Sequence, residues 1–154
     1  MRFAMHVKEI MTKGVITIPS TATLITAARV LAEHRISGAP VVDSEGTLVG
    51  IVSEKDLFKA LYPSHAEFYE NPGVWIDLDK LEEKAVEAAD KPIVDIMTRD
   101  VVTINPETSL MQVGSIMLVR GIHRVVVVGQ EGQIEGIVTR RDIYMKILTR
   151  RLKI

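Results

Sequence analysis

Two stretches of seven residues share a pattern that could bind an anionic ligand. Residues 50–56 read GIVSEKD, and residues 136–142 read GIVTRRD. In each, a β-branched run leads to a hydroxyl residue that can begin a helix, and the amides and dipole of a helix N-terminus attract phosphate. The aspartate three residues later has two acceptor oxygens suited to ribose hydroxyls, and the glycine leaves room for a flat base. The candidate residues are Gly50, Ser53 and Asp56 in one stretch and Gly136, Thr139 and Asp142 in the other.

The same spacing also fits a helix cap. A hydroxyl residue followed three positions later by an acid is close to a capping box, in which both side chains bond to backbone N–H groups. Capping boxes favour Glu or Gln as the acid or amide, whereas both stretches have Asp. A glycine also weakens a strand unless something approaches the backbone closely. These departures favour a binding site, but spacing alone leaves ligand binding and capping about equally open.

The two stretches close two copies of a longer repeat. A shift of 86 residues places Ile10 on Ile96, and the alignment continues without a gap to Leu61 and Ile147. Apolar periodicity and turn residues predict the order β-α-β-β-α in each copy, with the second helix beginning at the hydroxyl residue. This is an α/β (α+β) chain. Because a unit of about 50 residues is small for a core of its own, we expect each copy to cover the other's apolar face.

Residues 62–92 have no counterpart in the repeat. Apolar spacing behind Asp77 predicts a helix at about 77–89. The expected organisation is a first repeat at 7–61, an insert at 62–92 and a second repeat at 93–149. Aromatic residues concentrate in the insert, where they either pack it onto the repeats or form a lid or partner surface; they are Tyr62, Phe68, Tyr69 and Trp75.

Composition excludes several classes of function. The 154 residues are 47% apolar and carry a net charge of −1, so we expect no nucleic-acid partner and no membrane. Cysteine is absent, which excludes disulfides and thiolate catalysis, and the four histidines are scattered without a metal-binding or catalytic pattern. No apolar run approaches the roughly 20 residues of a membrane span. Charges near the N-terminus argue against a signal peptide, so a cytoplasmic protein without metal or catalysis is predicted.

Taken together, the repeated motifs resemble a tandem pair of CBS domains, also called a Bateman module. The openings VKEIMTKGVITI and VDIMTRDVVTI, the middles HRISGAPVVDSEG and IHRVVVVGQEG, and the two GIV endings carry the resemblance. It implies two β-α-β-β-α repeats related by a pseudo-two-fold axis, with their sheets packed together and helices on the flanks. It also implies clefts between the repeats for AMP, ADP, ATP or S-adenosylmethionine, and association into a homodimer.

The resemblance assigns site residues by position. The ribose and phosphate motif falls on the two GIV stretches. A phosphate-binding His-Arg pair falls on His123 and Arg124, whereas the first repeat has Ser37 and Gly38 there. The positions that line the base fall on Val15, Ile36, Ser37, Gly38, Ala39 and Pro40, and on Val101, Ile122 and Val125.

Charge differs between the copies. Arg140 and Arg141 stand where the first copy has Glu54 and Lys55. Guanidinium groups bind phosphate oxygens bidentately, so the second copy is the predicted phosphate site; a solvated helix face remains an equal alternative for Arg140. The function predicted is an adenine-nucleotide-binding regulatory or energy-sensing module acting on an unknown protein. The alternative is a ligand-independent dimerisation scaffold.

Overall fold

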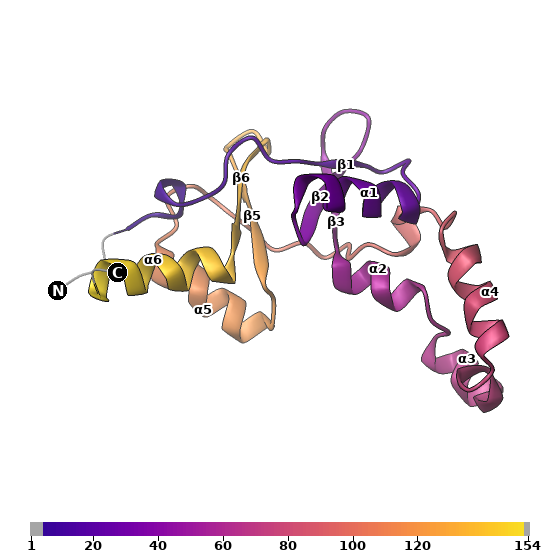
Figure 1. Ribbon diagram of the computed structural model, residues 1–154. Coiled ribbons are helices and arrows are strands. Elements are labelled where there is room, and N and C mark those ends of the chain that lie inside the picture. The colour runs from indigo at the N-terminus through magenta and orange to yellow at the C-terminus, as the bar shows by residue number, and fades with distance from the viewer. Residues whose placement is uncertain (1–4, 153–154) are drawn as a thin grey trace. The chain divides into compact units, whose positions relative to one another are not determined.

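The computed structural model describes the backbone of residues 5–152 and the side chains of residues 5–150 (Figure 1). The chain forms two compact units that cut across the sequence repeats. We call residues 16–100 the first unit, and residues 101–152 together with residues 5–15 the second unit. The opening segment of the first repeat (residues 7–15) therefore belongs to the unit that holds the second repeat's sheet. The opening segment of the second repeat (residues 93–100) belongs to the unit that holds the first repeat's sheet.

The first unit contains a three-stranded sheet in the order β1-β2-β3. Strand β1 runs parallel to β2, and β2 runs antiparallel to β3. Its elements are β1 (Ile18–Pro19), α1 (Leu24–His34), β2 (Gly38–Val42), β3 (Leu48–Ser53), α2 (Glu54–Ala60), α3 (His65–Glu70), η2 (Pro72–Trp75), α4 (Leu78–Ala88) and η3 (Ile93–Asp95).

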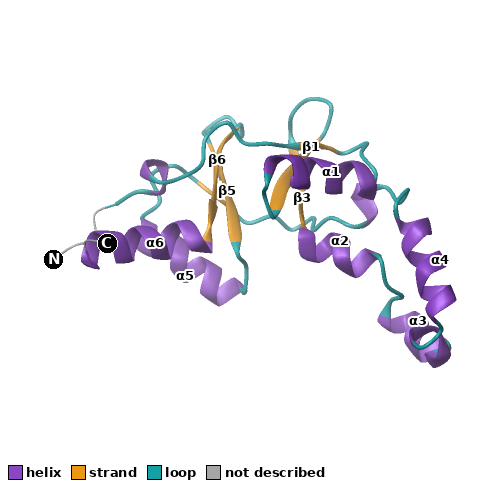
Figure 2. Cartoon of the chain, viewed as in Figure 1, coloured by secondary structure: helices purple, strands orange, loops and turns teal. Residues whose placement is uncertain are grey.

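The second unit repeats this topology without the insert. Strand β4 is parallel to β5, and β5 is antiparallel to β6. Its elements are η1 (Val7–Glu9), β4 (Thr103–Ile104), α5 (Leu110–Arg120), β5 (Arg124–Val128), β6 (Ile134–Thr139) and α6 (Arg140–Leu152). The predicted order β-α-β-β-α is thus confirmed in both copies (Figure 2).

Helices α1 and α5 are the first helix of each copy in the predicted order. The side chain of Thr23 accepts a hydrogen bond from Thr26 N, and that of Ser109 accepts one from Gln112 N, so both helices begin at a hydroxyl cap. Apolar residues at helical spacing face each core. They are Leu24, Ala27 and Leu31 in α1 and Leu110, Val113 and Met117 in α5.

Opening segments complete both sheets. In the first unit, Ile51 N donates to Thr98 O and Thr98 N donates to Ile51 O, each at 2.9 Å. In the second unit, the same pair of bonds joins Thr12 and Ile137 at 3.0 and 3.1 Å. These bridges, together with buried Ile93 and Val7, place the opening of one repeat in the core formed around the other.

The insert is more structured than the sequence predicted. Helix α4 matches the predicted helix, and Asp77 accepts a hydrogen bond from Lys80 N at its start. The prediction missed α3 and η2, although Ser64 and Glu67 form a complete capping box. Strands β1 and β4 have two residues each and are thus shorter than the β-branched runs VITI (15–18) and VVTI (101–104) that they overlap.

Aromatic rings join the insert to α2 within the first unit. Phe58 of α2 contacts Tyr62 with ring centroids 5.2 Å apart, and Trp75 lies 6.3 Å from Tyr62 and 5.8 Å from Phe68. This arrangement supports the interpretation that the aromatics pack the insert onto the repeat. Tyr69, at 80% exposure, lies outside that packing except for a contact with Phe68.

Candidate functional site

Each GIV stretch ends a strand and begins a helix. Ser53 is the last residue of β3 and the N-cap of α2, and Thr139 is the last residue of β6 immediately before α6. Across the ladders, Ser53 is paired with Gly38 and Thr139 with Arg124. The fold therefore brings the motif to the start of the neighbouring strand in both units.

Backbone hydrogen bonds fix this junction. Glu54 N donates to Ser37 O at 2.9 Å, and Arg140 N donates to His123 O at 2.8 Å. As a result, the predicted Ser37–Gly38 and His123–Arg124 positions lie beside the two helix starts. Arg124 is half-buried, whereas Arg140 and Arg141 are exposed on the first turn of α6.

Both aspartates act as helix caps. Ser53 N donates to Asp56 Oδ2 at 2.9 Å, and Thr139 N donates to Asp142 Oδ2 at 2.8 Å. The hydroxyls accept in return, from Asp56 N at 3.3 Å and from Asp142 N at 3.2 Å. The shorter aspartate therefore does complete a capping box, contrary to the argument that its length favours a binding site.

Capping uses only one oxygen of each carboxylate. Asp56 Oδ2 accepts from both Ser53 N and Ser53 Oγ, and Asp142 Oδ2 accepts from Thr139 N. Among the described residues, Oδ1 of each aspartate makes no hydrogen bond. A half-buried carboxylate held in this way has one oriented acceptor left, so capping and ligand binding are compatible.

The glycines of both motifs are covered by methionines. A Cβ at Gly50 would lie 2.4 Å from Met97 Sδ and 3.0 Å from Thr98 O. A Cβ at Gly136 would lie 2.5 Å from Met11 Sδ. The close approach that each glycine permits is thus made by an opening segment of the same unit. Sequence reasoning missed this role of the two methionines, although IMT recurs in both openings at the repeat spacing.

The predicted base-lining residues differ in burial. Most lie at or just before the start of β2 or β5, and only Val15 and Val101 precede the first strands. Val15 belongs to the second unit, whereas the other first-copy residues belong to the first. Ala39, Pro40 and Val125 are buried; Val15, Ile36, Gly38, Val101 and Ile122 are half-buried; Ser37 is exposed.

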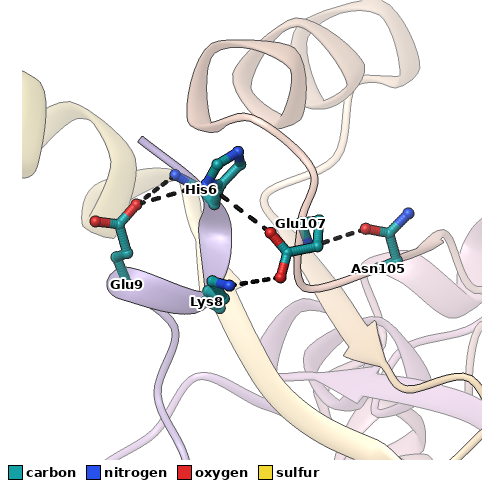
Figure 3. Close-up of polar contacts among 5 residues, drawn as sticks. All are labelled: His6, Lys8, Glu9, Asn105 and Glu107. Carbon is teal, nitrogen blue, oxygen red and sulfur yellow. Dashed lines mark hydrogen bonds and ion pairs between the residues drawn. The ribbon is translucent and has the colours of Figure 1, made fainter. Parts of the chain in front are cut away.

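A polar cluster holds the opening segment that covers Gly136 (Figure 3). Lys8 Nζ forms an ion pair with Glu107 Oε1 at 2.5 Å, and His6 N donates to Glu9 Oε2 at 2.6 Å. The hydrogen bond from Lys8 lowers the pKa of Glu107, and the same bond raises the pKa of Lys8. Glu107 N donates to Asn105 Oδ1, which orients the loop between β4 and α5.

Two other classes of site are absent from the described part of the chain. There, no group of three or more His, Asp or Glu residues is placed to hold a metal ion. No helix within that part is long and apolar enough to cross a membrane. The last turns of α6 carry the exposed basic residues Lys146 and Arg150, and the basic residues Arg151 and Lys153 lie outside the described side chains.

A family model for the CBS domain matches residues 7–63 and 93–149. The chain belongs to the CBS-domain family. Uncharacterized protein MJ1426 of Methanocaldococcus jannaschii is 32% identical to this CBS protein over 150 residues, which cover 90% of this chain and 89% of that one. Uncharacterized protein MJ1225 of the same organism is 32% identical over 142 residues, which cover 92% of this chain but 42% of that one.

Solved structures share the CBS-pair fold. The CBS domain pair of protein MJ0100, in complex with 5'-methylthioadenosine and S-adenosyl-L-methionine, is 30% identical with a TM-score of 0.74. The match covers 96% of this chain and 98% of that one. The predicted family and fold class are therefore confirmed.

Proposed function

We propose that this chain is a regulatory module that binds adenosine-type ligands at its two GIV motifs and catalyses no reaction itself. Both motifs are intact, each with a capped helix start and an aspartate Oδ1 that can accept from a ribose hydroxyl. The likeness to a CBS domain pair crystallised with 5'-methylthioadenosine and S-adenosyl-L-methionine supports this class of ligand.

The second motif is the proposed site for a nucleotide that carries phosphate, such as AMP, ADP or ATP. One observation carries this assignment: Arg124 is paired with Thr139 across the β5–β6 ladder, directly at the start of α6. A guanidinium group next to a helix N-terminus combines bidentate hydrogen bonding with a favourable dipole. Ligand phosphate would contact His123, Arg124 and Arg141 there, with Arg140 at the exposed edge.

The first motif is the proposed site for an adenosine-type ligand without phosphate, such as S-adenosylmethionine. Gly38 occupies the position paired with Ser53, so this position supplies no guanidinium group to the start of α2. The adjoining Glu54 and Lys55 have opposite charges. Binding here would depend on ribose hydrogen bonds and base contacts instead of on phosphate.

Calorimetric titration tests the assignment of phosphate to Arg124. Wild type is expected to bind AMP more tightly than adenosine, and Arg124→Ala to weaken AMP binding by about 10- to 100-fold, since a charge-assisted hydrogen bond contributes about 1.5–3 kcal/mol. Adenosine binding is expected to change less than about twofold. Arg120→Ala, which removes an exposed arginine from the end of α5, is the matched control. Equal affinities for AMP and adenosine in wild type and in Arg124→Ala would refute the assignment.

A homodimer is the second proposal, and it rests on exposed apolar side chains of α5 and α6. Leu118 and Val119 are 79% and 82% exposed, and Met111, Tyr144, Met145 and Leu148 are each more than 40% exposed. Helices α5 and α6 contact each other, and contiguous apolar patches on a protein surface mark interaction sites. Leu118→Glu is expected to convert a dimer to a monomer in light scattering, with Glu131→Gln as the control. If AMP, adenosine and S-adenosylmethionine all fail to raise the melting temperature of that dimer, the scaffold alternative holds instead.

A further inference from the structure

The first unit contains a cavity that the GIV motifs do not explain. Its volume is about 920 Å³, and its lining comes from α2, residues 62–64, α3, Trp75 of η2 and the segment that holds Lys91, Asp95 and Ile96. Small-molecule sites commonly have volumes of roughly 300–1,000 Å³. Most of this lining comes from the insert and its flanks, so the second unit has no counterpart.

Aromatic rings form one wall of the cavity. Phe58, Tyr62 and Trp75 all line it, and the ring of Tyr62 contacts the rings of both Phe58 and Trp75. The planes of Tyr62 and Trp75 are inclined by only 11°, and the two residues are 41% and 37% exposed. A wall of this kind offers accessible ring faces, on which flat apolar ligands stack favourably.

The acids of the cavity are largely occupied by bonds within the protein. Asp56 caps Ser53, and Glu67 accepts from Ser64 N and pairs with Lys84. The hydrogen bond from Lys84 is the main cause of a lowered pKa at Glu67, to which the nearby charge of Lys91 also contributes. The remaining acid is the exposed Asp95.

The two lysines of the cavity, unlike Glu67, form no ion pair within the described part of the chain. They are Lys59 and Lys91, and both are exposed. The carboxylates of the lining keep their negative charges, but Glu67 is bonded at both oxygens and Asp56 at Oδ2. Lys59 and Lys91 are therefore the cationic groups of the lining that are available to bind a ligand anion. An ammonium group binds an anion as a compact point charge.

We propose that this cavity binds a small aromatic anion, such as an aromatic carboxylate or sulfonate. Its ring lies against Tyr62 and Trp75, and its acid group is held by Lys59 and Lys91. This goes beyond nucleotide binding because the ligand differs in chemistry and the site depends on the insert. Asp56 is the one residue that the cavity shares with a GIV motif.

A pair of probes that differ in charge tests the proposal. The anionic probe is 8-anilinonaphthalene-1-sulfonate, and the neutral one is N-phenyl-1-naphthylamine, which lacks the sulfonate. Trp75 is the only tryptophan of the chain, so quenching of its fluorescence reports binding at this wall. The sulfonate is expected to quench Trp75 saturably with one site per chain, and the neutral probe to bind at least about tenfold more weakly.

Variants show whether the lysines cause this difference. The double variant Lys59→Met/Lys91→Met is expected to weaken sulfonate binding about tenfold or more and to leave the neutral probe within about twofold. Lys55→Met, on α2 but outside the cavity, is the matched control and is expected to change neither. Equal binding of both probes in wild type, or sulfonate binding within twofold of wild type in the double variant, would overturn the proposal. Arg124→Ala should not affect either probe, so failure of the nucleotide assignment would be seen separately.

Discussion

The two units share one topology but differ at the junction of strand and helix. In the second unit Arg124 stands opposite Thr139, and in the first Gly38 stands opposite Ser53. The reciprocal capping bonds to backbone N–H groups occur in both, as does the hydrogen bond from the first helical N–H to the residue just before β2 or β5. The backbone of the junction is thus alike in the two units although its charge differs, which fits our proposal that the two motifs bind ligands with different dependence on phosphate.

Substitution of Gly50 and Gly136 tests whether the methionines pack against the two junctions in the same way. Gly50→Ala and Gly136→Ala are each expected to lower the free energy of unfolding by about 1–3 kcal/mol, because the new Cβ would overlap Met97 or Met11. Urea denaturation measures the loss. Gly73→Ala, whose Cβ would meet only Asn71 Oδ1 at 3.5 Å, is the control and should cost little.

A double-mutant cycle identifies the contact responsible. Adding Met97→Ala to Gly50→Ala removes the overlapping atoms, so the double variant should lose about 0.5–3 kcal/mol less than the sum of the single losses. Additive losses would show that Met97 does not press on Gly50, and the equivalence of the two junctions would fail.

The aspartates separate capping from ligand binding. Asp56→Ala and Asp142→Ala are each expected to cost about 1 kcal/mol of stability, since Ser53 N or Thr139 N loses its acceptor. Asp56→Ala should cost somewhat more, because Asp56 Oδ2 also accepts from Ser53 Oγ. Asp142→Ala should in addition weaken AMP binding, measured by calorimetry. Unchanged AMP affinity with reduced stability would leave Asp142 as a cap alone.

A smaller difference lies at the ends of α1 and α5. Arg35 closes α1 with φ at 53°, whereas Gly121 closes α5 with φ at 64°. Because a side chain is strained in this left-handed region, Arg35→Gly is expected to stabilise the protein by about 0.5 kcal/mol, and Gly121→Ala to destabilise it by about 1 kcal/mol. Urea midpoints of both variants measure the effect. Two losses of equal size would mean that Arg35 is not strained.

The smallest expected effect concerns surface ion pairs, with Lys8–Glu107 in one unit and Lys84–Glu67 in the other. Hydrogen bonds from the lysines lower the pKa of both glutamates from the ordinary value of 4.5. Each pair therefore stabilises the fold above that value, and the stabilisation is lost as the pH falls through the lowered pKa.

The pH dependence can be assigned by removing one lysine at a time. Lys8→Met and Lys84→Met should each reduce the loss of stability between about pH 5 and pH 2, measured by urea denaturation. About 0.5 M salt should shrink the difference from wild type, because both pairs are substantially exposed. A pH profile identical to wild type in Lys8→Met would show that its pair contributes nothing.

Much of the fold follows from local signals in the sequence. Apolar spacing and turn residues predicted the order of strands and helices in both copies, the GIV stretches predicted the junctions of β3 with α2 and β6 with α6, and Asp77 predicted the start of α4. Helix α3 was missed because its six residues are too few to show an apolar period, although its capping box was visible.

The site was only partly predictable. The spacing of Thr139 and Asp142 identified a helix start, but which backbone groups Asp142 bonds to depends on geometry that spacing does not contain. The contact of Met97 with Gly50 joins residues 47 positions apart in the chain, and no local pattern reports such a partner. The cavity beside Trp75 likewise depends on how the insert folds back along α2.

Because the two repeats exchange their opening segments, the stretch of sequence that is repeated is not the stretch that folds as one compact unit. A gene duplication copies a contiguous stretch, yet Thr98 completes the sheet of the first copy and Thr12 that of the second. A fragment cut between the repeats would thus carry a sheet whose covering methionine is on the other piece. When the two fragments are mixed, we expect them to associate, because each supplies the opening segment that the other lacks.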